Sequence, residues 1–247
     1  MIALGYALAL LIGLALGLLG GGGSILTIPV LHYVMGYGMK AAVPMSLVVV
    51  GLTSGVGAVA HRRAGTLSLR TVAAFGPPAI VGALLGAELG LRTTAELQLT
   101  VFAVVMLAAA LSMYLGQSAI ERGGERPRRS ILLVILVGGL VGVLTGFVGV
   151  GGGFLYVPAL VLLGGLPMKR AVGTSLALIM ISCIAGVVRY HGSLNLDWSA
   201  IALFTGIALL GVGLGSRLVL HVSQAALRRG FAVFVLVMGA MVLLLGR

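Results

Sequence analysis

The segment that decides the fold is Gly-Gly-Gly-Gly-Ser-Ile-Leu-Thr-Ile-Pro-Val-Leu at residues 20–31, which recurs as Gly-Val-Gly-Gly-Gly-Phe-Leu-Tyr-Val-Pro-Ala-Leu at 149–160. Both copies lie inside a longer repeat, because residues 17–47 and 146–176 are identical at 14 of 31 aligned positions. The chain is therefore an internal duplication. A structural role found for one glycine-rich motif is expected for the other as well.

The composition around these motifs is that of a membrane protein. Of the 247 residues, 60% are hydrophobic and only 9% are charged, and the mean hydropathy is +1.21. A soluble domain of this size carries about a quarter charged residues, so this chain could not cover itself with polar side chains. The composition excludes a soluble enzyme, and its high apolar content excludes an intrinsically disordered chain.

Each half contains five apolar stretches. They cover residues 2–19, 24–36, 41–60, 71–91 and 97–115 in the first half, and 131–148, 153–166, 171–188, 199–216 and 229–246 in the second. The second stretch of each half rises only about 20 Å as a helix, whereas the hydrocarbon core is about 30 Å thick. We therefore expect an all-α, polytopic membrane bundle with a short broken or re-entrant helix after each glycine-rich motif.

The stretches define three parts of the chain. These are a first membrane repeat at 1–116, a linker at 117–130 and a second membrane repeat at 131–247. Isolated glycines within the stretches, Gly82 and Gly86 with their repeat mates Gly211 and Gly215, are expected to serve helix packing, because small residues let membrane helices approach closely.

Positive charge is distributed unevenly between the loops. If every stretch crosses, twelve of the 16 Lys and Arg lie on one face and four on the other; if only the short stretches are re-entrant, the split is nearly even, at nine and seven. Because cytoplasmic loops are enriched in Lys and Arg, we expect the basic face and the linker 117–130 in the cytoplasm. Both termini then lie outside, and the second repeat is inverted. The first two stretches of a half could instead form a hairpin that enters the membrane and returns to the same side. This hairpin gives the same distribution of charge as two full crossings, so the charge count does not distinguish the two topologies.

The net charge of +11 does not indicate a nucleic-acid partner. Most Lys and Arg residues sit singly or in pairs between apolar stretches, as charges that orient helices in a bilayer do. We therefore expect the lipid bilayer, and no nucleic acid, as the surroundings of this chain.

The glycine-rich motifs predict an anion-binding break between helices. Glycine allows close approach of a ligand, and the first turn of the following helix offers unpaired N–H groups with a partial positive charge. Irregular backbone in a membrane is tolerated only where it is buried in protein or lines a watery cavity. Tight helix packing is the alternative. The candidate substrate-binding residues are Gly22, Gly23, Ser24 and Thr27 in the first half and Gly151, Gly152 and Gly153 in the second.

The third stretch of each half adds a stripe of hydroxyl groups. Ser46 and Thr53 are seven residues apart, as are Ser175 and Ser182, so each pair lies on one helix face. Thr174 stands next to this stripe. These hydroxyls either donate to an oxyanion or bond back to their own backbone or a neighbouring helix. The residues alone leave both interpretations open.

Few titratable groups lie in or beside the apolar stretches. Glu88 stands four residues before Arg92, which favours a surface ion pair over a proton relay. His32 could carry a coupling proton, although its repeat mate is Val161. Arg189 could attract an anion to the entrance or place its charge at the lipid interface.

The sequence contains no signature of catalysis. Paired carboxylates and metal-ligand spacings are missing, so we expect no catalytic residue, no metal and no cofactor. No Gly-x-x-x-x-Gly-Lys-Ser/Thr loop occurs, so transport energy would come from an ion gradient or from the substrate itself. Asp197 is expected to cap the helix that starts at Trp198.

The doubled motif resembles the signature of the sulfite exporter TauE/SafE family. The resemblance rests on the two glycine-rich motifs, each followed by Ala-Val-x-x-Ser-Leu, and covers essentially the whole chain. The first half departs from the pattern at Pro44-Met45, where the second half has Gly173-Thr174. The resemblance implies a carrier of the bacterial cytoplasmic (inner) membrane for small sulfur-containing anions.

The combined expectation is a secondary active transporter that moves sulfite or an organosulfonate by alternating access, with an anion site between the halves. H⁺ or Na⁺ would be the coupling ion. An anion channel is the main alternative, and a non-transporting membrane scaffold or an intramembrane enzyme is a weaker one. A homo-oligomer stays open.

Overall fold

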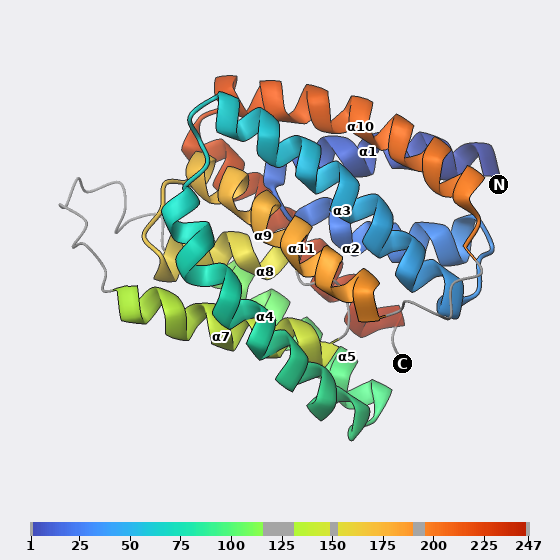
Figure 1. The fold of residues 1–247 in the computed structure, drawn as a ribbon, viewed down its shortest axis with the longest axis horizontal. Coiled ribbons are helices and arrows are strands. Elements are labelled where there is room, and N and C mark those ends of the chain that lie inside the picture. The colour runs from blue at the N-terminus through green and yellow to red at the C-terminus, as the bar shows by residue number, and fades with distance from the viewer. Residues whose placement is uncertain (1, 116–130, 149–152, 190–195, 246–247) are drawn as a thin grey trace.

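A computed structural model describes residues 2–115, 131–148, 153–189 and 196–245, in which every regular element is a helix. The first half contains α1 (Ile2–Leu19), α2 (Gly22–Pro29), η1 (Val30–Val34), α3 (Met39–Arg63), α4 (Leu69–Leu91) and α5 (Ala95–Leu115). The second half contains α7 (Ile131–Val148), α8 (Gly153–Pro158), η2 (Ala159–Leu163), α9 (Met168–Arg189), α10 (Trp198–His221) and α11 (Gln224–Leu245). The predicted all-helical bundle is confirmed (Figure 1). The linker 117–130, Gly151 and Gly152 lie outside the described residues.

Six of the described helices are long and apolar enough to cross a membrane, namely α3, α4, α5, α9, α10 and α11. Helices α1 and α7 and the two short segments α2–η1 and α8–η2 are apolar as well. Large apolar side chains such as Leu85, Leu136 and Leu210 are more than half exposed. A surface of this kind suits lipid, so the chain is a multi-pass membrane protein.

The two halves of the chain are intertwined. Helix α1 lies along α10, and α7 lies along α4, so the first helix of each half packs on the fourth helix of the other. Glycines make both contacts close: a Cβ on Gly211 would overlap the carbonyl oxygen of Leu10, and a Cβ on Gly82 would overlap that of Gly139. The packing role predicted for Gly82 and Gly211 is confirmed.

The third helices of the two halves, α3 and α9, run antiparallel to each other (Figure 1). Gly51 of α3 faces Cys183 of α9, whereas His61, near the end of α3, packs on Gly173, near the start of α9. Repeat mates that run in opposite directions support an inverted repeat. The inversion with respect to a bilayer stays a prediction.

Helix α1 and the short segment α2–η1 form an antiparallel hairpin. Two contacts show that the short segment runs back along α1: Gly23 lies against Leu16, and Met35 lies against Gly5. The chain reverses at Gly20, whose φ of 80° lies in the left-handed region that glycine reaches without steric cost. This path corresponds to the returning hairpin that the charge count left open; its depth in a bilayer stays a prediction.

Both short segments end in the same way. A single turn of π-helix follows Pro29 in η1 and Pro158 in η2. Proline has no N–H to donate, so the regular helical pattern cannot continue unchanged through it. Each segment then stops at a glycine with positive φ, Gly36 at 83° or Gly165 at 69°. The duplication is therefore preserved in the backbone as well as in the residues.

Positive charge gathers where α3 and α10 end and α4, α9 and α11 begin, and we call this region the basic end. Two hydrogen bonds join these helix ends: Ser68 N donates to Thr174 Oγ1 at 3.1 Å, and Met168 N donates to Gln224 Oε1 at 3.0 Å. The described cations at the basic end are Arg62, Arg63, Arg70, Lys169, Arg170, Arg217, Arg228 and Arg229. These are members of the larger group in the charge count.

Candidate functional site

The two glycine-rich breaks meet inside the bundle. A Cβ on Gly21 would overlap the carbonyl oxygen of Gly153, and a Cβ on Gly153 would lie 3.0 Å from Ser24 Oγ. Gly21 precedes α2 and Gly153 begins α8, so the amino ends of the two short helices touch. No side chain caps the amino end of α2.

The hydroxyl stripe of α9 reaches the first break. A Cβ on Gly20 would lie 2.6 Å from Ser175 Oγ and 2.9 Å from Val172 Cα. Ser175 and Thr174 are fully buried, and Ser24 is nearly so. The structure therefore brings together Ser24, Gly153 and Ser175 from three segments that are distant in the sequence.

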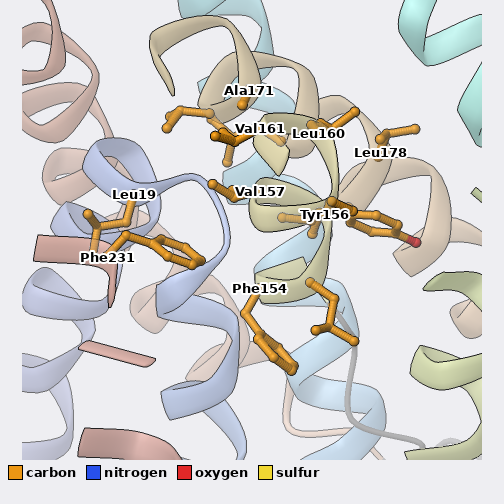
Figure 2. Close-up of a cluster of buried hydrophobic side chains, with 14 of the residues drawn as sticks. Leu19, Phe154, Tyr156, Val157, Leu160, Val161, Ala171, Leu178 and Phe231 are labelled. Atoms are coloured by element: carbon orange, nitrogen blue, oxygen red, sulfur yellow. The ribbon is translucent and has the colours of Figure 1, made fainter. Parts of the chain in front are cut away.

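Helix α8 lies deeper in the protein than α2. Every residue of α8 is buried, and Figure 2 shows Phe154, Tyr156 and Val157 as members of one cluster of buried side chains, with Leu19 and Phe231 on its left. The Phe154 ring meets Phe102 edge to face, with centroids 5.2 Å apart. The surroundings of α8 are accordingly mostly apolar.

Five candidate hydroxyl groups bond back to the backbone of their own segment. The bonds run from Ser24 Oγ to Gly21 O (2.7 Å), Thr27 Oγ1 to Gly23 O (3.2 Å), Ser46 Oγ to Val43 O (2.7 Å), Thr53 Oγ1 to Val49 O (2.7 Å) and Ser175 Oγ to Val172 O (2.8 Å). A hydroxyl has one proton to donate. Each of the five must rotate away from its carbonyl before it can donate to an anion.

The other two candidate hydroxyl groups bond outside their own backbone. Thr174 Oγ1 accepts from Ser68 N, and Ser182 Oγ pairs with the Tyr156 hydroxyl at 2.7 Å. Tyr156 is buried and packs edge to face on Phe75. The sequence reasoning missed Tyr156, although it is the repeat mate of Thr27. Because Thr27 was a candidate, applying the repeat to it would have identified Tyr156.

A second missed residue is His61, which is buried beside the first break. Its Nδ1 lies 2.8 Å from Thr66 Oγ1, and its Nε2 lies 3.5 Å from the carbonyl oxygen of Gly17. The apolar stretch 41–60 stops one residue short of His61, whereas α3 continues to Arg63. Hydropathy alone could not reveal that this polar helix end packs into the protein.

The three charged or titratable candidates lie on three different helical segments. Glu88 and Arg92 form the predicted exposed ion pair at 3.1 Å. His32 is partly exposed near the end of η1, and its Nδ1 lies 2.7 Å from the Tyr37 carbonyl oxygen. Arg189 is the last residue of α9, at the end away from Ser175.

A clasp joins the halves at the end opposite the basic end. The Tyr37 hydroxyl donates to Asp197 Oδ2 at 2.8 Å, while Asp197 Oδ1 accepts from Ala200 N at 3.0 Å and so caps α10, as predicted. Burial and, after it, the hydrogen bond to Asp197 raise the pKa of Tyr37 to about 12. Hydrogen bonds from Ser199, Ala200 and Tyr37 lower the pKa of Asp197 to about 2.

No group of three or more His, Cys, Asp or Glu side chains that could hold a metal ion occurs in the part of the chain that the structure describes. Cys183 is a free, buried thiol. The candidate site consists of glycine-rich backbone, hydroxyl groups and apolar side chains. Groups of this kind can hold an anion in a dry setting without a cofactor.

These features define a class: a multi-pass helical membrane protein built from two repeats, whose broken helices meet in the interior. Discontinuous helices at a repeat interface are typical of secondary transporters. A family model described as "Sulfite exporter TauE/SafE" matches residues 5–242. The chain belongs to the sulfite exporter TauE/SafE family.

Curated relatives agree with this assignment. A "Probable membrane transporter protein" of Xylella fastidiosa (strain Temecula1) is 32% identical over 231 residues, which cover 92% of this chain and 88% of the relative. The "Probable membrane transporter protein YfcA" of Escherichia coli K12 is 26% identical over 225 residues, or 90% and 82% of the two chains. The "Probable membrane transporter protein MJ0441" of Methanocaldococcus jannaschii is 27% identical over 194 residues, or 74% and 71%. No solved structure matches this chain. The family and these names indicate a membrane transporter rather than an enzyme.

Proposed function

We propose that this protein is a secondary active transporter that moves a small oxyanion, sulfite or an organosulfonate, across the bacterial cytoplasmic membrane by alternating access. The observation that carries the proposal is the contact between Gly21 and Gly153, which brings the amino ends of α2 and α8 together. The choice of sulfur-containing substrates rests on membership of the family.

The electrostatics of this contact favour an anion. A helix amino end carries about half a positive charge, and two such ends in contact repel each other in a setting of low dielectric constant. The described carboxylates, Glu88, Glu96 and Asp197, are exposed. A bound anion would supply the missing negative charge and would accept hydrogen bonds from the free N–H groups.

The hydroxyl groups complete the proposed site. Gly22, Gly23, Ser24, Thr27, Ser46 and Thr53 would contribute from the first half, and Gly151, Gly152, Gly153, Thr174, Ser175 and Ser182 from the second. Rotation of Ser24 and Ser175 away from their backbone carbonyls would turn both protons toward the anion. Because these two side chains are buried, substrate can reach them only after a rearrangement of the helices. Alternating access provides such a rearrangement.

The arrangement of charge supports an orientation. We place the basic end and the linker 117–130 in the cytoplasm and both termini outside, because Lys and Arg are enriched on the cytoplasmic side. The antiparallel run of α3 and α9 fits repeats of inverted topology. An H⁺ or Na⁺ gradient would drive transport. A homo-oligomer is compatible with this proposal and is not required by it.

Counterflow in proteoliposomes tests the proposed function. Vesicles loaded with unlabelled sulfite and diluted into trace radiolabelled sulfite should accumulate label transiently, because an alternating-access carrier exchanges substrate across the membrane. Taurine and acetate in place of sulfite test the sulfonate and plain carboxylate classes. A pH above neutrality keeps neutral sulfur dioxide from leaking through the lipid. Label that only equilibrates, without saturation or overshoot, would identify a channel instead.

A further inference from the structure

One arginine at the basic end is buried. Arg228 of α11 is 6% exposed, and it is the one buried Lys or Arg among the side chains that the structure describes. The next residue, Arg229, is exposed. A cation that only orients a helix in a bilayer does so from the headgroup region, where its charge reaches water. The burial of Arg228 therefore needs another explanation.

Arg228 lies on the face of α11 that points into the bundle. Gln224, Arg228 and Phe231 are spaced by four and then three residues, so they share one face of the helix. Gln224 Oε1 accepts from Met168 N at the start of α9. Phe231 is fully buried and lies beside Leu19, the last residue of α1 (Figure 2). Arg228 is therefore attached to α11 between the basic end and the first glycine break.

Helix α11 also borders the first break directly. A Cβ on Gly22 would lie 2.9 Å from Phe234 Cε1, so Phe234 reaches the amino end of α2. Arg228 precedes Phe231 by three residues and Phe234 by six, which is about 5 Å and 9 Å along a helix axis. Helical side chains lean toward the amino end of their helix. The guanidinium therefore lies on the side of the break that faces the basic end.

The chemistry of this side chain suits an oxyanion. A guanidinium is planar, stays charged at every physiological pH and carries five N–H donors in a fork that can hold two oxygens of one anion. Arg228 has an interaction of its own within the protein. With five donors it can keep that partner and still offer two N–H groups to an anion. A buried cation in a membrane bundle is costly and typically marks a substrate or ion pathway.

We propose that Arg228 binds the transported oxyanion between the basic end and the first glycine break, with two guanidinium N–H groups donating to two oxygens of the anion. This inference rests on the proposed transport function and adds a recognition residue that works from one side of the membrane. The residue 129 positions earlier is Leu99, so the first half has no matching guanidinium. Because Arg228 is buried, the anion reaches it when the helices at the basic end separate.

Binding can be measured as the rise in thermal stability that sulfite causes in the purified protein, because a ligand stabilises the folded state that binds it. Arg228→Gln removes the charge, Arg228→Lys keeps the charge without the fork, and Arg229→Gln changes the exposed neighbour as a matched control. We expect the sulfite concentration for half-maximal stabilisation to rise at least about tenfold in Arg228→Gln. It should rise less in Arg228→Lys and stay at the wild-type value in Arg229→Gln.

Arg228→Lys keeps the test decisive if Arg228→Gln does not fold, because loss of the fork alone should weaken binding. A wild-type dependence on sulfite in either folded Arg228 variant would overturn the inference.

Transport from the two faces separates binding from a structural role. Sulfite uptake into inside-out vesicles starts at the face that is cytoplasmic in cells, and uptake into right-side-out vesicles starts at the outer face. We expect Arg228→Gln to raise the half-saturating sulfite concentration about tenfold at one face and to leave it nearly unchanged at the other. The affected face should be the one at which the linker lies. Equal changes at both faces would indicate a structural role and overturn the inference.

The two measurements also separate this inference from the proposed function. Stabilisation by sulfite that depends on Arg228, without counterflow in the wild type, would remove the transport proposal and leave the anion site. Counterflow with the same dependence on sulfite in the wild type and in Arg228→Gln would leave the transporter and remove the site. A wild type that neither sulfite nor taurine stabilises would also remove the site.

Discussion

The carbonyl oxygen of Gly153 occupies the position that a Cβ on Gly21 would need, so the two glycine-rich breaks are in backbone contact. Two segments from opposite halves of the chain thereby form one centre. The contact explains the glycine at position 21: any side chain there would push the amino ends of α2 and α8 apart.

Substitution at this contact should impair transport. Gly21→Ala introduces a methyl group where Gly153 and Phe154 already lie, and overpacking of this kind costs about 1–3 kcal/mol. We expect sulfite counterflow to fall about tenfold or more, with normal membrane insertion. Gly38→Ala is the matched control, because nothing lies within 4 Å of its added Cβ and its φ is −61°. Equal effects of the two changes would contradict the central role of the contact.

Removal of the Ser175 hydroxyl tests whether this group binds the anion or only bonds to its own backbone. Ser175→Ala should lower the counterflow rate while insertion stays normal, because one proposed donor to the anion is lost. Ser112→Ala removes the same kind of bond, from Ser112 Oγ to Ala108 O, on an exposed face of α5 and should have no effect. A bulky replacement at Gly152 should also impair transport. Wild-type rates in both Ser175→Ala and the Gly152 variant would rule out this assignment of the site.

The contact of α1 with α10 predicts opposite effects for two glycines of one helix. A Cβ on Gly211 would overlap the Leu10 carbonyl oxygen, whereas nothing lies within 4 Å of one on Gly213. Gly211→Ala should destabilise the protein by about 1–3 kcal/mol. Gly213→Ala should be neutral, or should stabilise the helix by up to about 1 kcal/mol. Thermal unfolding in detergent, followed by size-exclusion chromatography, compares them; equal losses of stability would contradict this packing.

The Tyr37–Asp197 clasp predicts a dependence on acid. Asp197 has a pKa of about 2 in the folded protein, below its ordinary 3.8, so its stabilising contribution is complete above pH 4 and is lost as the pH falls toward 2. Asp197→Asn should therefore flatten the stability profile in that window. It should also lower the Tyr37 pKa from about 12, while burial keeps it above 10. Ultraviolet titration of the phenol, with Tyr37→Phe as the blank, measures this change.

The orientation of the chain can be tested through its linker. Cys183 is buried and gives a low background of reactive thiol, so Ser118→Cys adds one accessible label. A membrane-impermeant maleimide should label Ser118→Cys in broken cells and leave it unlabelled in intact cells. Labelling from outside intact cells would place the basic end on the wrong side and overturn the proposed topology.

Much of the architecture could be predicted because it depends on composition and on duplication. The apolar stretches 71–91 and 171–188 correspond closely to α4 and α9, since a helix in lipid must satisfy its backbone internally and must carry apolar side chains. The two short segments that contain Pro29 and Pro158 could be predicted in the same way, because their apolar stretches are too short to cross the hydrocarbon core. The predicted ends of the helices were less accurate. The apolar stretch 41–60 stops before His61, whereas α3 extends to Arg63.

The site could be predicted only in part. Ser24 and Ser175 were identified as candidates, but their use as backbone-bonded hydroxyls beside one break depends on local rotamers and on the approach of α9. Tyr156 and His61 were missed, because each gains its importance from a partner, Ser182 or Gly17, that is remote in the sequence. A pattern along one helix does not record what a second helix places opposite it.

The sequence by itself therefore determined that this protein is a duplicated, helical, multi-pass membrane protein with paired helix breaks, since hydropathy, glycine and proline act locally along the chain. Only the tertiary structure decided that the first helix of each half packs on the fourth helix of the other, and that Gly21 meets Gly153. Such contacts depend on close backbone approach between distant segments. Where two such segments meet depends on the shapes of both packed surfaces together. The residues of one segment do not specify the surface of the other.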